Sequence, residues 1–217
     1  MTATLPSELR DVFERSATAE LVTIDAEGHP VARSVSPTYH QGEVCIDVPL
    51  GTPVEDPRVA LLFGGDGPMV LVQGTAAGND VVHVRPERVY AWRHGDPEGE
   101  PRLFDAHLEE VRSGHNEEPE VGHAEPEGGG GVWDERLDGL EAGMLACVCP
   151  DGFPFAAHVT VEPQRDEGLL LLASVPLGMP VEPGPAVLHA ADGAFVVGDL
   201  MPHASAGWGL LPHRLSS

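Results

Sequence analysis

The chain has 217 residues, 41% of them hydrophobic, which is enough for one large domain or two small ones. It has 35 acidic and 12 basic residues, the latter all arginines, and its formal net charge is −23. This charge argues against binding to nucleic acid or to an anionic membrane, and the absence of lysine excludes Schiff-base chemistry on a lysine and a phosphate-loop lysine. No apolar stretch approaches the roughly 18 residues of a membrane span, and the N-terminal residues lack the pattern of an export signal, so we expect a cytoplasmic protein.

The first predicted element is a short helix near the N-terminus. Leu5, Leu9, Val12 and Phe13 fall on one helical face, and Pro6 suits the first turn of a helix. We expect this helix to cover one end of a β structure.

Short strands follow, separated by turns rich in Gly and Pro. Alternation and branched residues predict strands at 21–25, 31–36, 43–48, 58–63 and 69–76. In the second of these, Val31, Arg33 and Val35 share one face, so a positive charge lies among apolar positions and needs a partner or a ligand. The pattern is that of a β-barrel or sandwich and not of alternating strands and helices.

Residues 94–131 differ in composition from the rest of the chain. They are acidic and rich in Gly and Pro, and they include a predicted second helix at 103–114 that ends at a glycine. The segment also holds His94, His107, His115 and His123, whose spacing matches no compact metal-binding motif, so no metal site is predicted.

A second set of strands is predicted at 144–149, 155–162, 168–175, 186–191 and 194–200. Cys147 and Cys149 lie two residues apart, on one face of the first of these strands, and we interpret them as small core residues.

The two sets of strands are copies of one unit. GHPVARSV at 28–35 resembles GFPFAAHV at 152–159, and VPLGTPVE at 48–55 matches VPLGMPVE at 175–182 at seven of eight positions. A weaker match sets VQGTA at 72 beside VVGDL at 196. Three matches in the same order indicate an internal duplication, with a first unit at 1–93, a connecting segment at 94–131 and a second unit at 132–217. The two units could pack together as an intramolecular pseudo-dimer, or the chain could form a homodimer.

The first unit also resembles a known superfamily. The carrying features, in order, are a Gly-x-Pro turn, a strand with Arg-x-Val, DPRVALL at 56–62, VLVQG at 70–74 and VRPERVYAW at 84–92. In this order and spacing the chain resembles the pyridoxamine 5′-phosphate oxidase-like split β-barrels, over residues 5–92 clearly and over 140–215 more weakly. The resemblance implies a mainly β fold of split-barrel type, with two repeated units and a few short capping helices.

The same resemblance implies a cofactor and a set of residues that hold it. Members bind FMN, a deazaflavin coenzyme or haem, commonly at a dimer interface, and many are oxidoreductases. The cofactor-binding positions that it implies are Arg33, Val48, Pro49, Thr52 and Arg58. Arg33 would clamp the phosphate, Thr52 would offer a hydroxyl, backbone amides from Val48 to Thr52 would contact the ring, and Arg58 is a second candidate for the phosphate.

The residues also allow other interpretations. Arg33 could form an ion pair with a carboxylate of its own sheet, and Arg58 could simply begin a strand at the surface. The basic partner that the family pattern places near Thr52 is missing, and the second copy has Ala157 where the first has Arg33. The leading hypothesis is therefore a flavin-binding oxidoreductase that acts on a small molecule, with two alternatives: a cofactor-free split barrel used for binding or structure, and a haem-binding protein.

Overall fold

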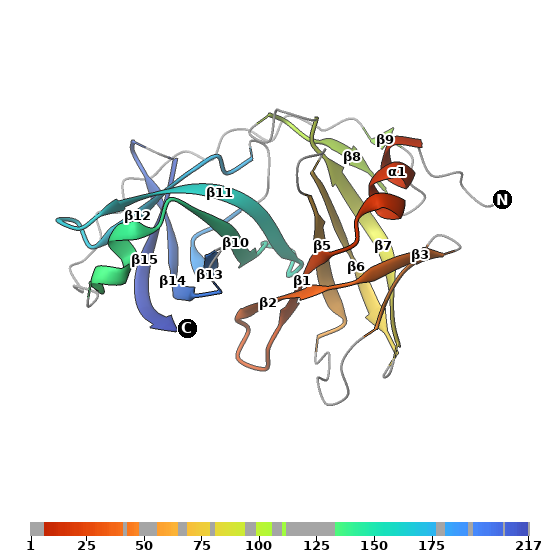
Figure 1. Ribbon diagram of the computed structural model, residues 1–217, viewed down its shortest axis with the longest axis horizontal. Helices are drawn as coiled ribbons and strands as arrows, with labels where there is room; N and C mark the ends of the chain where they lie inside the picture. The colour runs from red at the N-terminus through yellow and green to blue at the C-terminus, as the bar shows by residue number, and fades with distance from the viewer. Residues whose placement is uncertain are drawn as a thin grey trace.

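A computed structural model of the chain contains two β units that lie side by side (Figure 1). It describes residues 7–40, 43–47, 56–64, 69–78, 81–93, 99–105, 110–111, 133–176, 181–190, 193–205 and 207–216. The predicted site residues Val48, Pro49 and Thr52 and the four histidines at 94, 107, 115 and 123 lie outside this part of the chain.

The first unit is one helix and a sheet. The helix α1 (Ser7–Arg15) precedes β1 (Ala19–Ile24), β2 (Pro30–Val35), β3 (Pro37–His40), β4 (Glu43–Asp47), β5 (Arg58–Phe63), β6 (Val70–Ala77) and β7 (Val81–Ala91). Two further short strands, β8 (Arg102–Phe104) and β9 (Glu110–Val111), extend the sheet beyond β7. The order of neighbouring strands is β2-β1-β5-β6-β7-β4-β3, all antiparallel.

The second unit is a closed antiparallel barrel. A 3₁₀ helix, η1 (Glu135–Gly139), precedes β10 (Ala142–Val148), β11 (Pro154–Gln164), β12 (Leu169–Ala173), β13 (Gly184–Ala190), β14 (Phe195–His203) and β15 (Gly207–Ser216). The strand order around the barrel is β10-β11-β12-β15-β14-β13.

The two units share one strand order, which confirms the prediction of a mainly β fold with two repeated units. In the second unit the long strand β11 pairs with β10 through its first half and with β12 through its second half. In the first unit two strands do the same: β2 pairs with β1, and β3 pairs with β4. The single residue Ser36 separates β2 from β3. The first sheet therefore follows the same path as the closed barrel, with one strand bent into two.

The strand registers locate the duplication residue by residue. Gly74 and Gly198 occupy the same place, each opposite a proline (Pro86 or Pro212) at a register shift between the last two long strands of its unit. A Cβ atom on Gly74 would lie 2.2 Å from the carbonyl oxygen of Arg85, and one on Gly198 would lie 2.3 Å from that of Leu211. Only glycine fits at this bulge in either copy, which explains why the weak sequence match at 72 and 196 kept its glycine.

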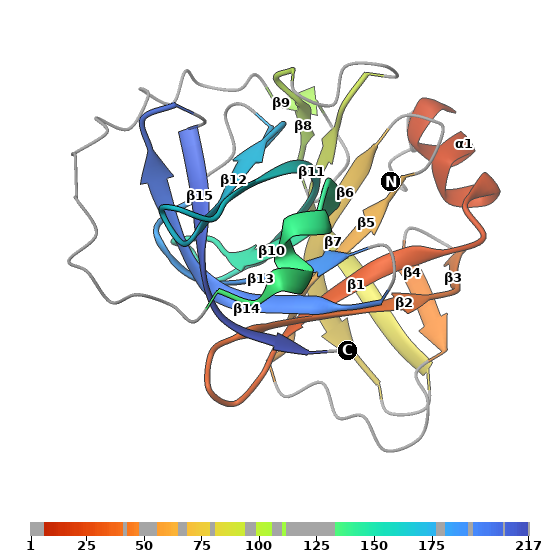
Figure 2. The same ribbon diagram turned by 60° about the vertical axis from the view of Figure 1, so that its left-hand side comes forward.

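The apolar cores of the two units meet. One cluster belongs to the first unit alone and includes Leu9 and Phe13 of α1, which confirms the predicted apolar face of this helix at those positions. The other cluster combines the core of the second unit with first-unit residues such as Leu62, Leu71 and Trp92. The contacts between units come mainly from β2 and β11, which each cross to the other unit (Figure 2). The two copies thus pack against each other within the chain.

Several predicted elements differ from the structure. The helix predicted at 103–114 is wrong where the structure describes it, because Phe104 lies in β8 and Val111 in β9, which pair with each other. The apolar spacing that indicated a helix also suits strand edges, and pairing with β7 decides between them. The only helices in the described chain are α1 and η1. Neither of these is long and apolar enough to cross a membrane.

Candidate functional site

Arg33 lies on β2, directly opposite Leu21 of β1, whose side chain is fully buried. The arginine is half-buried, and its Nε atom has no hydrogen-bond partner among the described residues. Burial lowers the pKa of the Arg33 guanidinium. On the same face of the strand, Val31 is 44% exposed, whereas Val35 is buried. The predicted apolar face is therefore buried only toward the end of the strand.

Arg58 is occupied by neighbouring carboxyl and carbonyl groups. Its Nε donates to Asp56 Oδ1 at 3.0 Å and its Nη2 to Asp56 Oδ2 at 2.5 Å, and Nη1 donates to the backbone oxygen of Asp151 in the second unit at 3.5 Å. This pairing lowers the pKa of Asp56 and raises that of Arg58. The space for the guanidinium comes from Gly152, where a Cβ atom would lie 1.8 Å from Nη1. In the described chain, Arg58 thus joins the two units and makes no contact with Arg33.

A pocket of about 410 Å³ lies between the units. One wall is the β1–β2 turn and the start of β2, and the other is formed by β13, β14 and β15 of the second unit. Its apolar lining comes from both units: Pro30, Val31, Ala32, Val187, Phe195 and Val197. Its volume falls within the range of small-molecule sites, roughly 300–1,000 Å³.

Two polar side chains of this pocket, His189 and Arg214, differ in their hydrogen bonding. His189 stacks on Phe195, with ring centroids 5.9 Å apart, and its Nε2 atom is buried without a hydrogen-bond partner in the described structure. Burial lowers the pKa of His189, and the carboxylate of Glu20 opposes part of this effect. Arg214 donates from Nε to Ser216 Oγ at 3.2 Å. His189 therefore lines the pocket with an imidazole whose neutral form is favoured, and its Nε2 atom is enclosed by the protein.

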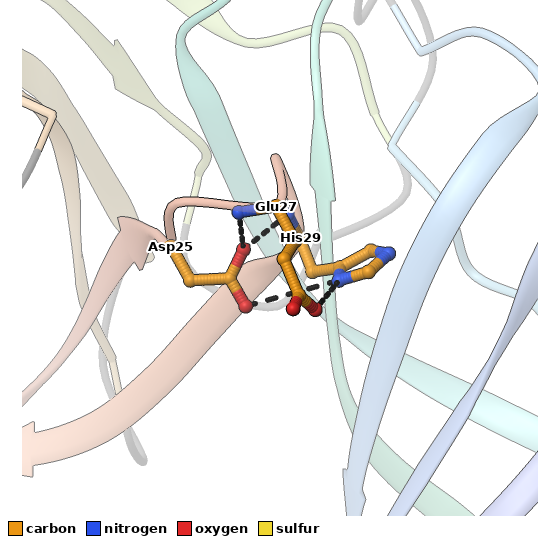
Figure 3. A group of neighbouring side chains, drawn as sticks. All are labelled: Asp25, Glu27 and His29. Carbon is orange, nitrogen blue, oxygen red and sulfur yellow. Dashed lines mark hydrogen bonds and ion pairs between the residues drawn. The ribbon is translucent and has the colours of Figure 1, made fainter.

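The β1–β2 turn brings Asp25, Glu27 and His29 together at the pocket (Figure 3). Gly28 has φ +85° and closes the turn by donating its N–H to the Asp25 carbonyl at 3.0 Å, a conformation that glycine adopts without strain. Asp25 Oδ1 accepts the N–H groups of Glu27 and His29 at 2.9 and 2.8 Å. His29 Nδ1 lies 3.6 Å from Glu27 Oε2 and 3.8 Å from Asp25 Oδ2.

These three side chains have ligand atoms within 4.8 Å of one another, a set that could hold a divalent cation. The contacts inside the turn account for the arrangement without an ion. The carboxylates of Asp25 and Glu27 add negative charge to the lining of the pocket, which also includes Arg214.

Sequence reasoning did not identify this pocket. His29 and His189 are 160 positions apart in numbering, and Arg214 lies in β15, beyond the last strand predicted from the sequence. One signal was available: the PER triplet at 86–88 and the PHR triplet at 212–214 occupy equivalent strand positions, so a longer repeat would have indicated Arg214.

The comparisons with known proteins bear on the fold. No family model matches the sequence, and no curated protein matches it. Among solved structures, the heme binding protein from Mycobacterium smegmatis is 16% identical, with 46% of this chain and 57% of that one covered at a TM-score of 0.40. General Stress Protein 26 from Bacillus anthracis str. Sterne is 13% identical, with 46% and 96% covered at a TM-score of 0.38.

A third similar structure is a protein from Clostridium acetobutylicum that is related to general stress protein 26 and assigned to the pyridoxinephosphate oxidase family. It is 12% identical, with 46% of this chain and 92% of that one covered at a TM-score of 0.38. Each of these three similarities covers about half of this chain.

Proposed function

We propose that this chain is a flavin-binding protein of split-barrel type, that its pocket between the units holds the flavin ring, and that the bound flavin gives it oxidoreductase activity. The observation that carries the proposal is the mostly apolar pocket of about 410 Å³ between the units, whose lining includes the imidazole of His189 stacked on Phe195. A largely apolar pocket of this volume with a few polar groups is the usual form of a small-molecule site.

The lining suits a flat heteroaromatic ring. The apolar side chains of both units offer contact to its faces, and the stacked His189 and Phe195 rings offer an aromatic surface. A flavin ring has an edge of N–H and C=O groups, and the ring nitrogens of a neutral imidazole can donate to or accept from such an edge. The flavin supplies hydride and electron transfer when it is bound, while the residues of the pocket bind it, orient it and exclude water.

The pocket suits a phosphate group less well. Among the described residues, Arg214 is the one arginine in its lining, and the carboxylates of Asp25 and Glu27 lie in the same lining. A dianion next to two carboxylates loses much of the attraction that one guanidinium provides. We therefore expect the ring to dominate binding, so that riboflavin binds about as tightly as FMN. Arg33 does not line this pocket, and its role as a phosphate clamp stays a prediction.

Titration of the full-length protein with riboflavin and with FMN, followed by flavin fluorescence, tests the proposal. The structure offers a matched pair of variants, because Val31 and Val81 are 44% and 39% exposed on strands of the same unit and only Val31 lines the pocket. Val31→Trp should fill the pocket and weaken both flavins about tenfold or more, which is about 1.4 kcal/mol. Val81→Trp should leave binding unchanged. Failure of the wild-type protein to bind either flavin would overturn the proposal, as would equal binding by both variants.

The variant Arg33→Ala tests whether Arg33 holds the phosphate of FMN or whether the protein holds only the flavin ring. If Arg33 clamps it, this variant weakens FMN and leaves riboflavin unchanged. If the ring alone is held, both flavins bind Arg33→Ala as they bind the wild-type protein.

The haem alternative has its own supporting observation, since His29 and His189 both line the pocket and imidazole is a common ligand of iron. The volume, near the lower end for small-molecule sites, favours the smaller flavin ring over the haem macrocycle. A parallel titration with haemin decides: a sharp haem absorption band that is lost in His189→Ala supports haem and not flavin.

A further inference from the structure

The duplication gives the pocket a counterpart on the other side of the molecule. The strand registers set β5, β6 and β7 in the places of β13, β14 and β15, and they set the β10–β11 turn in the place of the β1–β2 turn. Residue by residue, Gln73 corresponds to Val197 and Arg88 to Arg214. Phe153 corresponds to His29, because both turns close in the same way around a glycine.

At the counterpart position the turn is fixed against the first unit. Arg88 Nη2 lies 2.6 Å from Asp151 Oδ2, and the Arg88 guanidinium lies over the Phe153 ring, 4.8 Å from its centroid. The fully buried Gln73 donates from Nε2 to the backbone oxygen of Pro154 at 2.8 Å. These groups form a lock that joins the β10–β11 turn to β6 and β7.

Buried apolar side chains also fill the counterpart position. Phe155 is fully buried in the shared core, whereas its counterpart Val31 is 44% exposed and lines the pocket. Leu62 and Leu71 fill the places of His189 and Phe195 and belong to the same shared core.

The pocket side lacks each part of the lock. Val197 has no amide with which to hold the turn, His29 replaces the phenyl ring, and Arg214 donates to Ser216 of its own strand. Glu27, in the place of Asp151, lies beside His29 instead. The two turns have the same backbone closure, so the difference between an open and a closed position lies in these side chains.

We infer that the chain has one ligand site per molecule, and that the lock of Gln73, Arg88, Asp151, Phe153 and Phe155 closes a second position that the duplication would otherwise provide. The inference rests on the proposed function for the ligand class, which is the flavin ring. It adds the stoichiometry of the site and the residues that decide it.

An exchange of residues between the two positions tests the inference. The opening variant Gln73→Val/Phe153→His/Phe155→Val gives the closed position three of the side chains of the open one. The closing variant Val197→Gln/His29→Phe/Val31→Phe does the reverse. In calorimetric titrations with riboflavin, the wild-type protein should bind one molecule per chain, the opening variant two and the closing variant none. Two molecules bound by the wild-type chain would overturn the inference, as would one molecule bound by a folded opening variant.

A measurement without ligand keeps the inference testable if the variants do not fold or if the wild-type protein binds no flavin. The amides of Asp25 and Cys149 make the same turn hydrogen bond, to His29 O at 3.0 Å and to Phe153 O at 2.8 Å. If the lock holds only the second turn, the Cys149 amide exchanges about tenfold more slowly than the Asp25 amide. Arg88→Ala should remove this difference, and Arg214→Ala should not. Equal exchange of the two amides in the wild-type protein would refute the lock, whereas absence of flavin binding alone would refute only the proposed function.

Discussion

His189 shows how one buried side chain links the pocket to stability. Its ring is stacked on Phe195, its Nε2 atom is enclosed, and burial lowers its pKa. A histidine with a lowered pKa in the folded state takes up protons more readily in the unfolded chain. The stability that this adds is complete above the unfolded pKa of about 6.5 and is lost as the pH falls through the folded value.

The pH dependence of unfolding tests this effect. Between pH 7 and pH 5 the wild-type protein should lose free energy of unfolding relative to His189→Gln, by up to about 1.4 kcal/mol per pH unit, because Gln keeps the hydrogen-bonding groups and does not titrate. Urea unfolding at three pH values measures the difference. The comparison with the variant cancels the titration of the many carboxylates, and parallel curves for the two proteins would contradict the buried state of His189.

At the scale of elements, the bulge at Gly74 and Gly198 governs how the last strands of each unit pair. The register between β14 and β15 shifts at Val197/Gly198, and the backbone of Leu211 occupies the space that a side chain at 198 would need. The bulge lies next to Val197 and opposite the strand that carries Arg214, so it also sets one wall of the pocket. A shift of β15 would change the pocket as well as the barrel.

Gly198→Ala should destabilise the protein by about 1–3 kcal/mol, because the added methyl group must displace a backbone carbonyl that lies 2.3 Å from its ideal position. Gly139→Ala is the matched control, since Gly139 has an ordinary backbone conformation and nothing within 4 Å of an added Cβ atom. Thermal unfolding of both variants measures the effect, and equal midpoints would argue against the close approach at the bulge.

At the scale of the whole molecule, the shared apolar cluster makes the two units one cooperative structure. Leu62, Leu71 and Trp92 of the first unit belong to the same buried cluster as the core of the barrel. Arg58, Gln73 and Arg88 add hydrogen bonds and an ion pair across the same boundary. Neither unit can unfold without exposing apolar surface of the other.

Two single-tryptophan proteins test this cooperativity, one that retains Trp92 in the first unit and one that retains Trp208 in the second, with the other tryptophans replaced by Phe. Their denaturant transitions should coincide, and Leu62→Ala should lower the free energy of unfolding by about 2–5 kcal/mol as seen by both probes. A transition at Trp92 that precedes the one at Trp208 would show that the units unfold separately.

Some elements of this fold are determined by residues that are close together in the sequence. The apolar residues along β1, β5 and β6, the Gly-x-Pro turns and the apolar face of α1 are patterns of residues a few positions apart, so the strands, the helix and the duplication could be predicted. The short strands β8 and β9 could not, because an isolated apolar spacing fits a helix as well and only pairing with β7 selects the strand.

Only the tertiary structure decided where the pocket lies. Arg33 and Arg58 were identifiable as charges in or beside strands, but whether a guanidinium is free or held depends on partners such as Asp151, which the chain brings to Arg58 from another unit. The pocket residues His29, His189 and Arg214 come from strands of different copies. The sequence by itself determined two similar units; the contacts between them, made by side chains that differ between the copies, left one interface position open and closed the other.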